Sequence, residues 1–166
     1  MNAANMTDRI LKSYESYYDI RKEDVCPPFV AEAVFHSHNE QYIFLKSAKL
    51  SEQDSNEFVF FANEDTLDAD RIRLLDQTAW QEGLSRVTPH RNHRNSDITL
   101  VVIAETVSKE AVSCIKKLHH YQSYRFGLQG WSNYRVIVLE TSTGSLTYNR
   151  QGRELRKLYQ RINKQK

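Results

Sequence analysis

The stretch Ile98-Thr99-Leu100-Val101-Val102-Ile103-Ala104 sets the architecture that this sequence predicts. The run is almost entirely apolar and rich in β-branched residues, and it does not alternate with polar residues as a strand with one solvated face would. Such a run is typical of a central strand that is covered on both faces. We therefore expect residues 98–104 to form the most buried strand of a sheet that has helices packed against it.

The residues before this strand predict two helices and three strands. Aromatic and aliphatic side chains recur at helical spacing behind Thr7, which has the side chain of an N-cap. Alternation of period two then indicates strands, which we expect to form an antiparallel meander. The predicted elements are a helix from Thr7 to Tyr18, strands at 29–36, 42–50 and 57–62, a helix at 67–82, and an exposed basic loop at 86–96.

The residues after the central strand predict two helices and two strands. Ser108 and Asn149 are the expected helix caps, and strands are predicted at 124–128 and 134–140. Gly130 begins the turn between those strands, where a positive φ is expected. The prediction is one domain over residues 1–166, of the α+β class. It has a single mixed, largely antiparallel sheet flanked by helices, in the order αβββαβαββα.

The composition excludes several classes of protein. The 166 residues are enough to bury a core without a metal or a disulfide framework. Cys26 and Cys114 lie too far apart in the sequence to form a C-x-x-C motif, so both are expected to be reduced thiols. The first residues have no apolar signal segment, and no window is apolar enough to span a membrane. We expect a cytoplasmic protein with no membrane partner.

Charge is distributed unevenly along the chain. Residues 1–85 hold 8 Lys/Arg and 16 Asp/Glu, whereas residues 86–166 hold 15 Lys/Arg and 5 Asp/Glu, so the two parts carry −8 and +10. The basic part suits an anionic partner such as nucleic acid. The alternative is that the acidic and basic halves face each other, within one molecule or across a homodimer.

Cations in the basic half recur on one face of the predicted last helix. Steps of three or four residues place Arg153, Lys157 and Arg161 together, opposite Leu155, Leu158, Tyr159 and Ile162. The simplest interpretation is a solvated helix face, and the functional one is a stripe that binds phosphates. The candidate polyanion-binding residues are Arg91, Arg94, Lys116, Lys117, Arg125, Arg153, Lys157 and Arg161.

Histidines supply an alternative site. His36 and His38 form one pair and His90 and His93 another, and such pairs could bind zinc or a similar divalent ion. Arginines beside the second pair would oppose a divalent cation, so no cofactor is expected and a divalent metal is the alternative. A second candidate is a polar pocket in which His36, Lys46, Lys49 and Arg135 converge.

Two resemblances bear on function. The leading order αβββαβ is similar to that of the restriction-endonuclease-like core, whose third strand carries Glu-x-Lys or Asp-x-Lys. Here that strand reads Glu57-Phe58-Val59, and Lys46 and Lys49 lie on the second predicted strand instead. The whole chain, above all residues 36–42 and 127–132, resembles a family of uncharacterised bacterial proteins of unknown function. That resemblance implies a small bacterial cytoplasmic protein and carries no reaction with it.

Together these features favour a binding or regulatory module over an enzyme. A basic C-terminal half that contacts polyanions or nucleic acid is the first hypothesis. A metal-dependent hydrolase or a degenerate nuclease-like enzyme is the second, and a self-associating interaction protein is the third.

Overall fold

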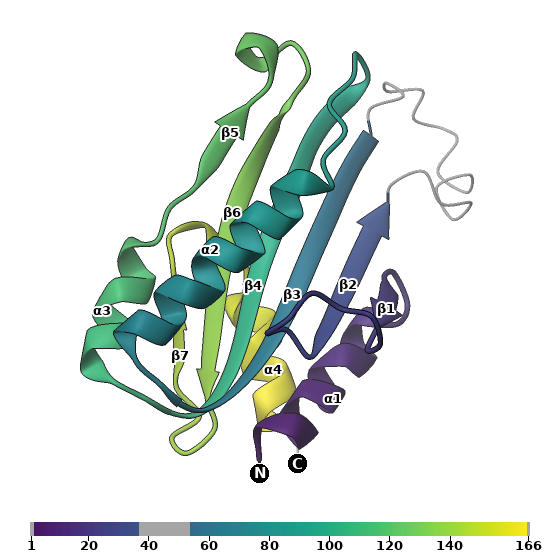
Figure 1. Cartoon of the computed structure of the whole chain (residues 1–166). Coiled ribbons are helices and arrows are strands. Elements are labelled where there is room, and N and C mark those ends of the chain that lie inside the picture. The colour runs from purple at the N-terminus through teal and green to yellow at the C-terminus, as the bar shows by residue number, and fades with distance from the viewer. Residues whose placement is uncertain (1, 37–53, 166) are drawn as a thin grey trace.

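Helices pack on both faces of one mixed sheet in a computed structural model that describes residues 2–36 and 54–165 (Figure 1). The α+β class and the single mixed sheet are therefore confirmed. The elements are α1 (Ala3–Tyr14), β1 (Asp19–Arg21), β2 (Ala31–His36), β3 (Asp54–Leu67), α2 (Ala69–Ser85), β4 (His93–Val107), α3 (Lys109–Lys117), β5 (Tyr121–Ser123), the 3-10 turn η2 (Arg125–Gly127), β6 (Trp131–Glu140), β7 (Leu146–Tyr148), the 3-10 helix η3 (Gln151–Leu155) and α4 (Arg156–Lys164).

The strand order in the described sheet is β1-β2-β3-β4-β6-β5, and β7 pairs with the far part of β6. The three long strands β3, β4 and β6 run parallel, with Phe60, Leu100 and Val136 side by side. The other pairings, which involve β1, β2, β5 and β7, are antiparallel. The sheet is thus antiparallel at its margins and parallel at its centre, because α2 and α3 provide the crossovers that parallel strands require.

The central strand is as buried as its sequence predicts. Every residue from Ile98 to Ala104 is inaccessible to solvent. Its even-numbered side chains, such as Leu100, pack in a cluster with α2 and α3, and its odd-numbered ones, such as Val101, pack with α1 and α4. Two hydrophobic cores therefore sandwich the sheet, and β4 belongs to both.

The predicted meander is wrong in one respect. β2 pairs directly with β3, with Ala33 opposite Val59, whereas a meander would pair each of them with the strand predicted at 42–50. Residues 42–50 themselves lie outside the described residues. The edge neighbour of β2 is instead β1, whose three residues are too few to give a periodic signal.

Three local predictions also need correction. Thr7 does not cap α1, because Asn2 does so by accepting from the Asn5 N–H, and Thr7 is buried within the helix. The basic stretch 86–96 is only partly a loop, since β4 begins at His93 and the side chains of His93 and Ser96 are buried. Residues 124–128 do not form a strand; they contain η2.

Several tyrosines bury their hydroxyl groups in the two cores. The hydroxyls of Tyr14 and Tyr159 lie 3.0 Å apart, and Tyr18 donates to Glu57 at 2.5 Å. Tyr134 contacts the Asp76 carbonyl from the other side of the sheet. Burial raises the pKa of Tyr14, Tyr18, Tyr134 and Tyr159, because the phenolate would lose its hydration.

The free energy of unfolding should therefore fall at alkaline pH. A tyrosine in the unfolded chain loses its proton near pH 10, whereas these buried tyrosines keep theirs, so stability present below pH 10 is lost above it. Each such tyrosine contributes a slope of up to about 1.4 kcal/mol per pH unit. Urea unfolding of the Tyr134→Phe variant between pH 8 and 11 should show a shallower decline. The exposed Tyr17 provides the control: Tyr17→Phe should decline as steeply as the parent, and an equal decline in all three proteins would contradict the prediction.

Candidate polyanion-binding surface

The last helical segment of the chain concentrates positive charge. Residues 150–166 contain seven Lys/Arg and a single acidic residue, Glu154. η3 and α4 pack on the sheet through the buried side chains of Tyr159 and Ile162, beside α1 (Figure 1). The segment is therefore a fixed part of the fold, and its outer side is available for a partner.

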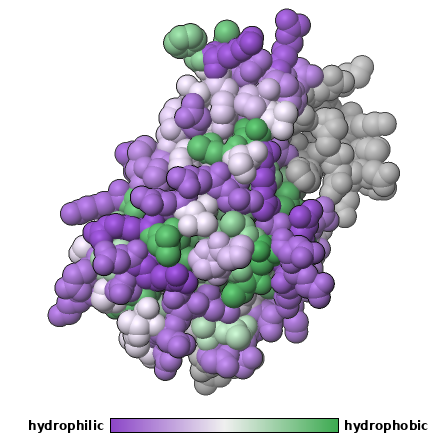
Figure 2. Space-filling view, in the orientation of Figure 1, coloured by the Kyte–Doolittle hydropathy of each residue, from purple (hydrophilic) through white to green (hydrophobic). Residues whose placement is uncertain are grey.

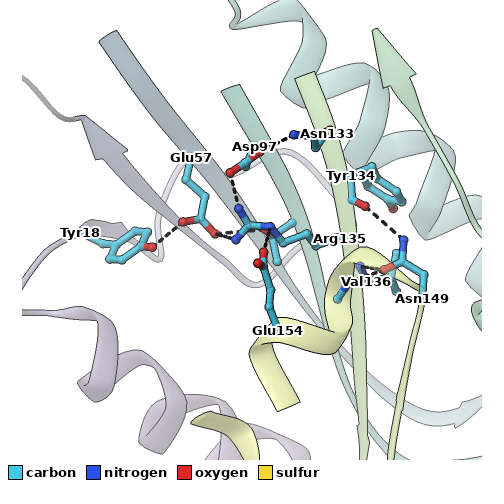
Figure 3. A network of polar contacts seen from close by, with 11 residues as sticks. Tyr18, Glu57, Asp97, Asn133, Tyr134, Arg135, Val136, Asn149 and Glu154 are labelled. Atoms are coloured by element: carbon cyan, nitrogen blue, oxygen red, sulfur yellow. Dashed lines mark hydrogen bonds and ion pairs between the residues drawn. The ribbon is translucent and has the colours of Figure 1, made fainter. Parts of the chain in front are cut away.

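Asn149 attaches the start of this segment to the sheet. Its buried amide oxygen accepts from the backbone N–H groups of Val136 at 2.9 Å and Gly152 at 2.8 Å. Its amide nitrogen donates to the carbonyl of Tyr134 at 3.1 Å (Figure 3) and to that of Leu118, also at 3.1 Å. The prediction that Asn149 caps the last helix is wrong by one residue, since the N-cap of η3 is Arg150; Asn149 precedes that cap and bonds the first turn through Gly152. One side chain thus ties β6, α3 and η3 together.

A network around Arg135 holds the segment at a second point. Arg135 projects from β6 with its side chain only 15% exposed, and it contacts Glu57 at 3.4 Å, Asp97, and Glu154 at 2.7 Å (Figure 3). Burial alone disfavours the guanidinium charge, but the carboxylates of Asp97, Glu57 and Glu154 outweigh it and raise the pKa of Arg135. Arg135 therefore stays charged and draws Glu154 toward the sheet.

The cations of the segment face outward. We define the cationic face as the exposed residues Arg150, Arg153, Lys157, Arg161 and Lys164. Among residues 2–36 and 54–165, none of these five has an ion-pair partner. Glu154, the acidic residue of the segment, pairs with Arg135 instead. Of the apolar positions predicted to face inward, Tyr159 and Ile162 are buried, Leu155 is half-buried, and Leu158 is exposed, so the prediction is wrong for Leu158.

Two shallow grooves follow this face. One, of about 650 Å³, is lined by Arg150, Gln151, Arg153, Glu154, Arg156 and Lys157. The other, of about 480 Å³, is lined by Lys157, Gln160, Arg161, Lys164 and Gln165. Lys157 belongs to both, so the grooves form one continuous cationic surface. The Gln151 side-chain oxygen is buried in the first groove without a hydrogen-bond partner in the described part of the chain.

The remaining predicted polyanion-binding residues lie in two other places. Lys116 and Lys117 are exposed at the end of α3, on the opposite face of the sheet from α4. Arg91, Arg94 and Arg125 lie at the end of the sheet where the turn before β4 meets η2, because His93 Nδ1 contacts the Gln129 carbonyl oxygen at 2.6 Å. The eight residues predicted as one set therefore belong to three separate surfaces.

The predicted polar pocket and the histidine sites are largely outside the described residues. This applies to His38, Lys46, Lys49 and the side chain of His36, while Arg135 lies in its carboxylate network. His93 uses both ring nitrogens, on the Gln129 carbonyl and on the Ser96 hydroxyl at 2.9 Å, so a metal shared with His90 would have to displace one of them. The described residues contain no group of three or more His, Cys, Asp or Glu side chains placed to hold a metal.

The acidic half does not cover the cationic face through the carboxylates that flank α2. Glu64 pairs with Arg71 at 2.8 Å, Asp70 pairs with Arg73 at 3.1 Å, and Asp68 caps α2. These bonds stay within residues 1–85. These three carboxylates therefore do not pair with the cations of the last helix.

None of the helices in residues 2–36 and 54–165 combines the length and the apolar content needed to cross a membrane. Comparison with curated proteins and with solved structures finds no match. A family model, described as Domain of unknown function (DUF8052), matches residues 2–161. Since the match spans nearly the whole chain, the expected membership of an uncharacterised family is confirmed: the chain belongs to the family of this domain of unknown function.

Proposed function

We propose that this chain is a binding module that holds a polyanion, with nucleic acid as the leading class, on the cationic face of η3 and α4. The observation that carries the proposal is the state of Glu154. The only acid in the segment binds Arg135, and the five cations of the face have no ion-pair partner among the described residues. When unpaired cations on a rigid surface bind a phosphate backbone, they release its condensed counterions, and this release favours association.

The groove beside the cations favours nucleic acid over a simple polyanion. The exposed residues Gln160 and Gln165 line the second groove together with the cations. A side-chain amide both donates and accepts hydrogen bonds, so these residues can bond the sugar and base groups that nucleotides carry and a polyphosphate chain lacks. The cations then position the backbone, and the groove contacts the groups attached to it.

Replacing Arg153, Lys157 and Arg161 together by alanine should abolish most of the affinity for nucleic acid. Three or four phosphate contacts give a slope of log affinity against log salt of roughly −3 to −4 on duplex DNA. The triple variant should flatten that slope and weaken binding by about the same factor for all sequences. Fluorescence anisotropy with a labelled 20-nucleotide duplex and single strand, titrated from about 50 mM salt upward, measures both quantities.

The matched control is the Lys109, Lys116 and Lys117 triple alanine variant. It removes the same charge from exposed positions of α3, on the opposite face of the sheet. It should keep the affinity and the slope of the parent. Equal losses in both variants would indicate non-specific attraction, and absence of binding by the parent at low salt would remove nucleic acid from consideration. Sedimentation velocity across the same salt range tests the self-association hypothesis.

A further inference from the structure

The connection between β5 and β6 presents apolar side chains that the core does not use. We call residues 125–129 the tip; it includes η2 and projects at the end of the sheet (Figure 1). Phe126 is fully exposed and Leu128 is 79% exposed. Figure 2 shows hydrophobic groups beside strongly hydrophilic ones at this extremity, and further hydrophobic groups in the middle of the same face. Packing in the core therefore does not explain why Phe126 and Leu128 are apolar.

The backbone of the tip holds an uncommon conformation. Arg125, Phe126 and Gly127 have successive φ values of +46°, +54° and +85°. Left-handed conformations are unfavourable for residues with a Cβ, and they persist where surrounding contacts impose them. Here Tyr124 and Gly130 exchange backbone hydrogen bonds with the tip and with each other, and Tyr124 also bonds Ser132 at 2.8 Å. The hydrogen bonds of Tyr124 and Gly130, where the tip joins the sheet, therefore maintain this conformation, while the Phe126 side chain lies in solvent.

Three arginines belong to the tip and to the segment that adjoins it. Arg125 precedes Phe126, and Arg91 and Arg94 lie in the adjoining segment that His93 ties to Gln129. All three arginines are exposed, and no ion pair engages them within the described ranges 2–36 and 54–165. An anionic partner is therefore favoured at this end of the molecule, and the partner must also accommodate one aromatic ring.

We infer that the tip binds unpaired bases of a single-stranded nucleic acid, with Phe126 stacking on a base and Arg91, Arg94 and Arg125 contacting the flanking phosphates. This inference rests on the proposed function, and it narrows the partner to a strand with accessible bases. Aromatic stacking combined with a positive track is the usual means of holding such strands. In a duplex the bases are already stacked, so the ring gains nothing there.

An anionic membrane surface suits the tip less well. Phe126 and Leu128 together carry fewer side-chain carbons than a myristoyl chain, which by itself gives only marginal membrane binding. The exposed apolar area is small and narrow, so a lipid surface would gain little from it. A single ring is, by contrast, sufficient for one base.

The test compares Phe126→Leu with Phe126→Tyr in anisotropy titrations of a labelled 20-nucleotide oligothymidine and a 20-base-pair duplex. Phe126→Leu keeps the apolar character and loses the ring, so single-strand affinity should fall about 5- to 150-fold. Phe126→Tyr keeps the ring and should bind like the parent. Duplex affinity and the salt slope should be unchanged in both variants. Leu128→Ala is the control for loss of apolar area and should have little effect.

The outcomes separate this inference from the proposed function. If the parent binds oligothymidine, the cationic-face triple variant weakens that binding, and Phe126→Leu does not, the tip inference alone is overturned. If the parent binds neither oligonucleotide, the proposed function fails as well. Sedimentation with phosphatidylserine vesicles adds a third arm: binding that Phe126→Leu retains and Phe126→Ala loses would assign the tip to a membrane surface and overturn the inference.

Discussion

Replacement of Arg86 by methionine is expected to lower the free energy of unfolding by about 3–5 kcal/mol. The reason is Glu32, which lies on β2 with a side chain only 1% exposed. Arg86 Nη2 contacts Glu32 at 2.8 Å and Glu82 at 2.8 Å, and the guanidinium lies over the Phe60 ring. Without Arg86 the Glu32 carboxylate would remain buried with little compensation, and an uncompensated buried charge is among the costliest defects in a protein.

Arg21 provides the matched control for this prediction. It also contacts Glu32, but at 3.4 Å and with a side chain that is 66% exposed. Arg21→Met should therefore cost at most about 1 kcal/mol. Adding Glu32→Gln to Arg86→Met should recover part of the loss, because the neutral amide is easier to bury. Chemical denaturation of the four proteins measures these values, and similar small losses from Arg86→Met and Arg21→Met would show that Glu32 does not depend on Arg86.

The fold was predictable where the sequence carries a repeated signal. The apolar run of β4 is long enough to identify a central strand, and the helical spacing around Tyr159 and Ile162 identifies the buried side of α4. The tip shows where such signals fail. Its aromatic and aliphatic residues resemble a strand in composition, yet they are exposed in a left-handed turn, because composition does not report backbone φ.

The candidate site was predictable in part for the same reason. The spacing of Arg153, Lys157 and Arg161 follows from helical periodicity, so their common exposed face needs no knowledge of tertiary contacts. The ion pair between Arg135 and Glu154, by contrast, depends on tertiary contacts. So do the contacts of Arg135 with Glu57, 78 positions away, and with Asp97, 38 positions away. Glu57, Asp97 and Arg135 each stand directly before the apolar run of a central strand, but polar residues flank these runs at both ends, so the sequence does not single the three out.

Gly130→Ala should lower the free energy of unfolding by about 3 kcal/mol or more. Gly130 follows the tip with φ +81°, which confirms the positive φ that its place in the turn predicts. A Cβ there would lie 2.2 Å from the Arg94 carbonyl oxygen and 2.7 Å from His93 Nδ1. The first atom belongs to the backbone of β4 and the second to a buried ring bonded to Gln129, so neither can move without disturbing the sheet end.

Gly127 separates the two contributions to that loss. Its φ of +85° is nearly the same, but nothing lies within 4 Å of its ideal Cβ position. Gly127→Ala should therefore cost only the left-handed conformation, about 1–2 kcal/mol. Thermal and urea unfolding of both variants give the difference, which is the cost of the collision with Arg94 and His93. Equal losses would mean that β4 and the base of the tip are not in close contact.

Because that contact holds the tip in place, Gly130→Ala should also weaken single-strand binding at a temperature where the variant is still folded, whereas Gly127→Ala should weaken it less.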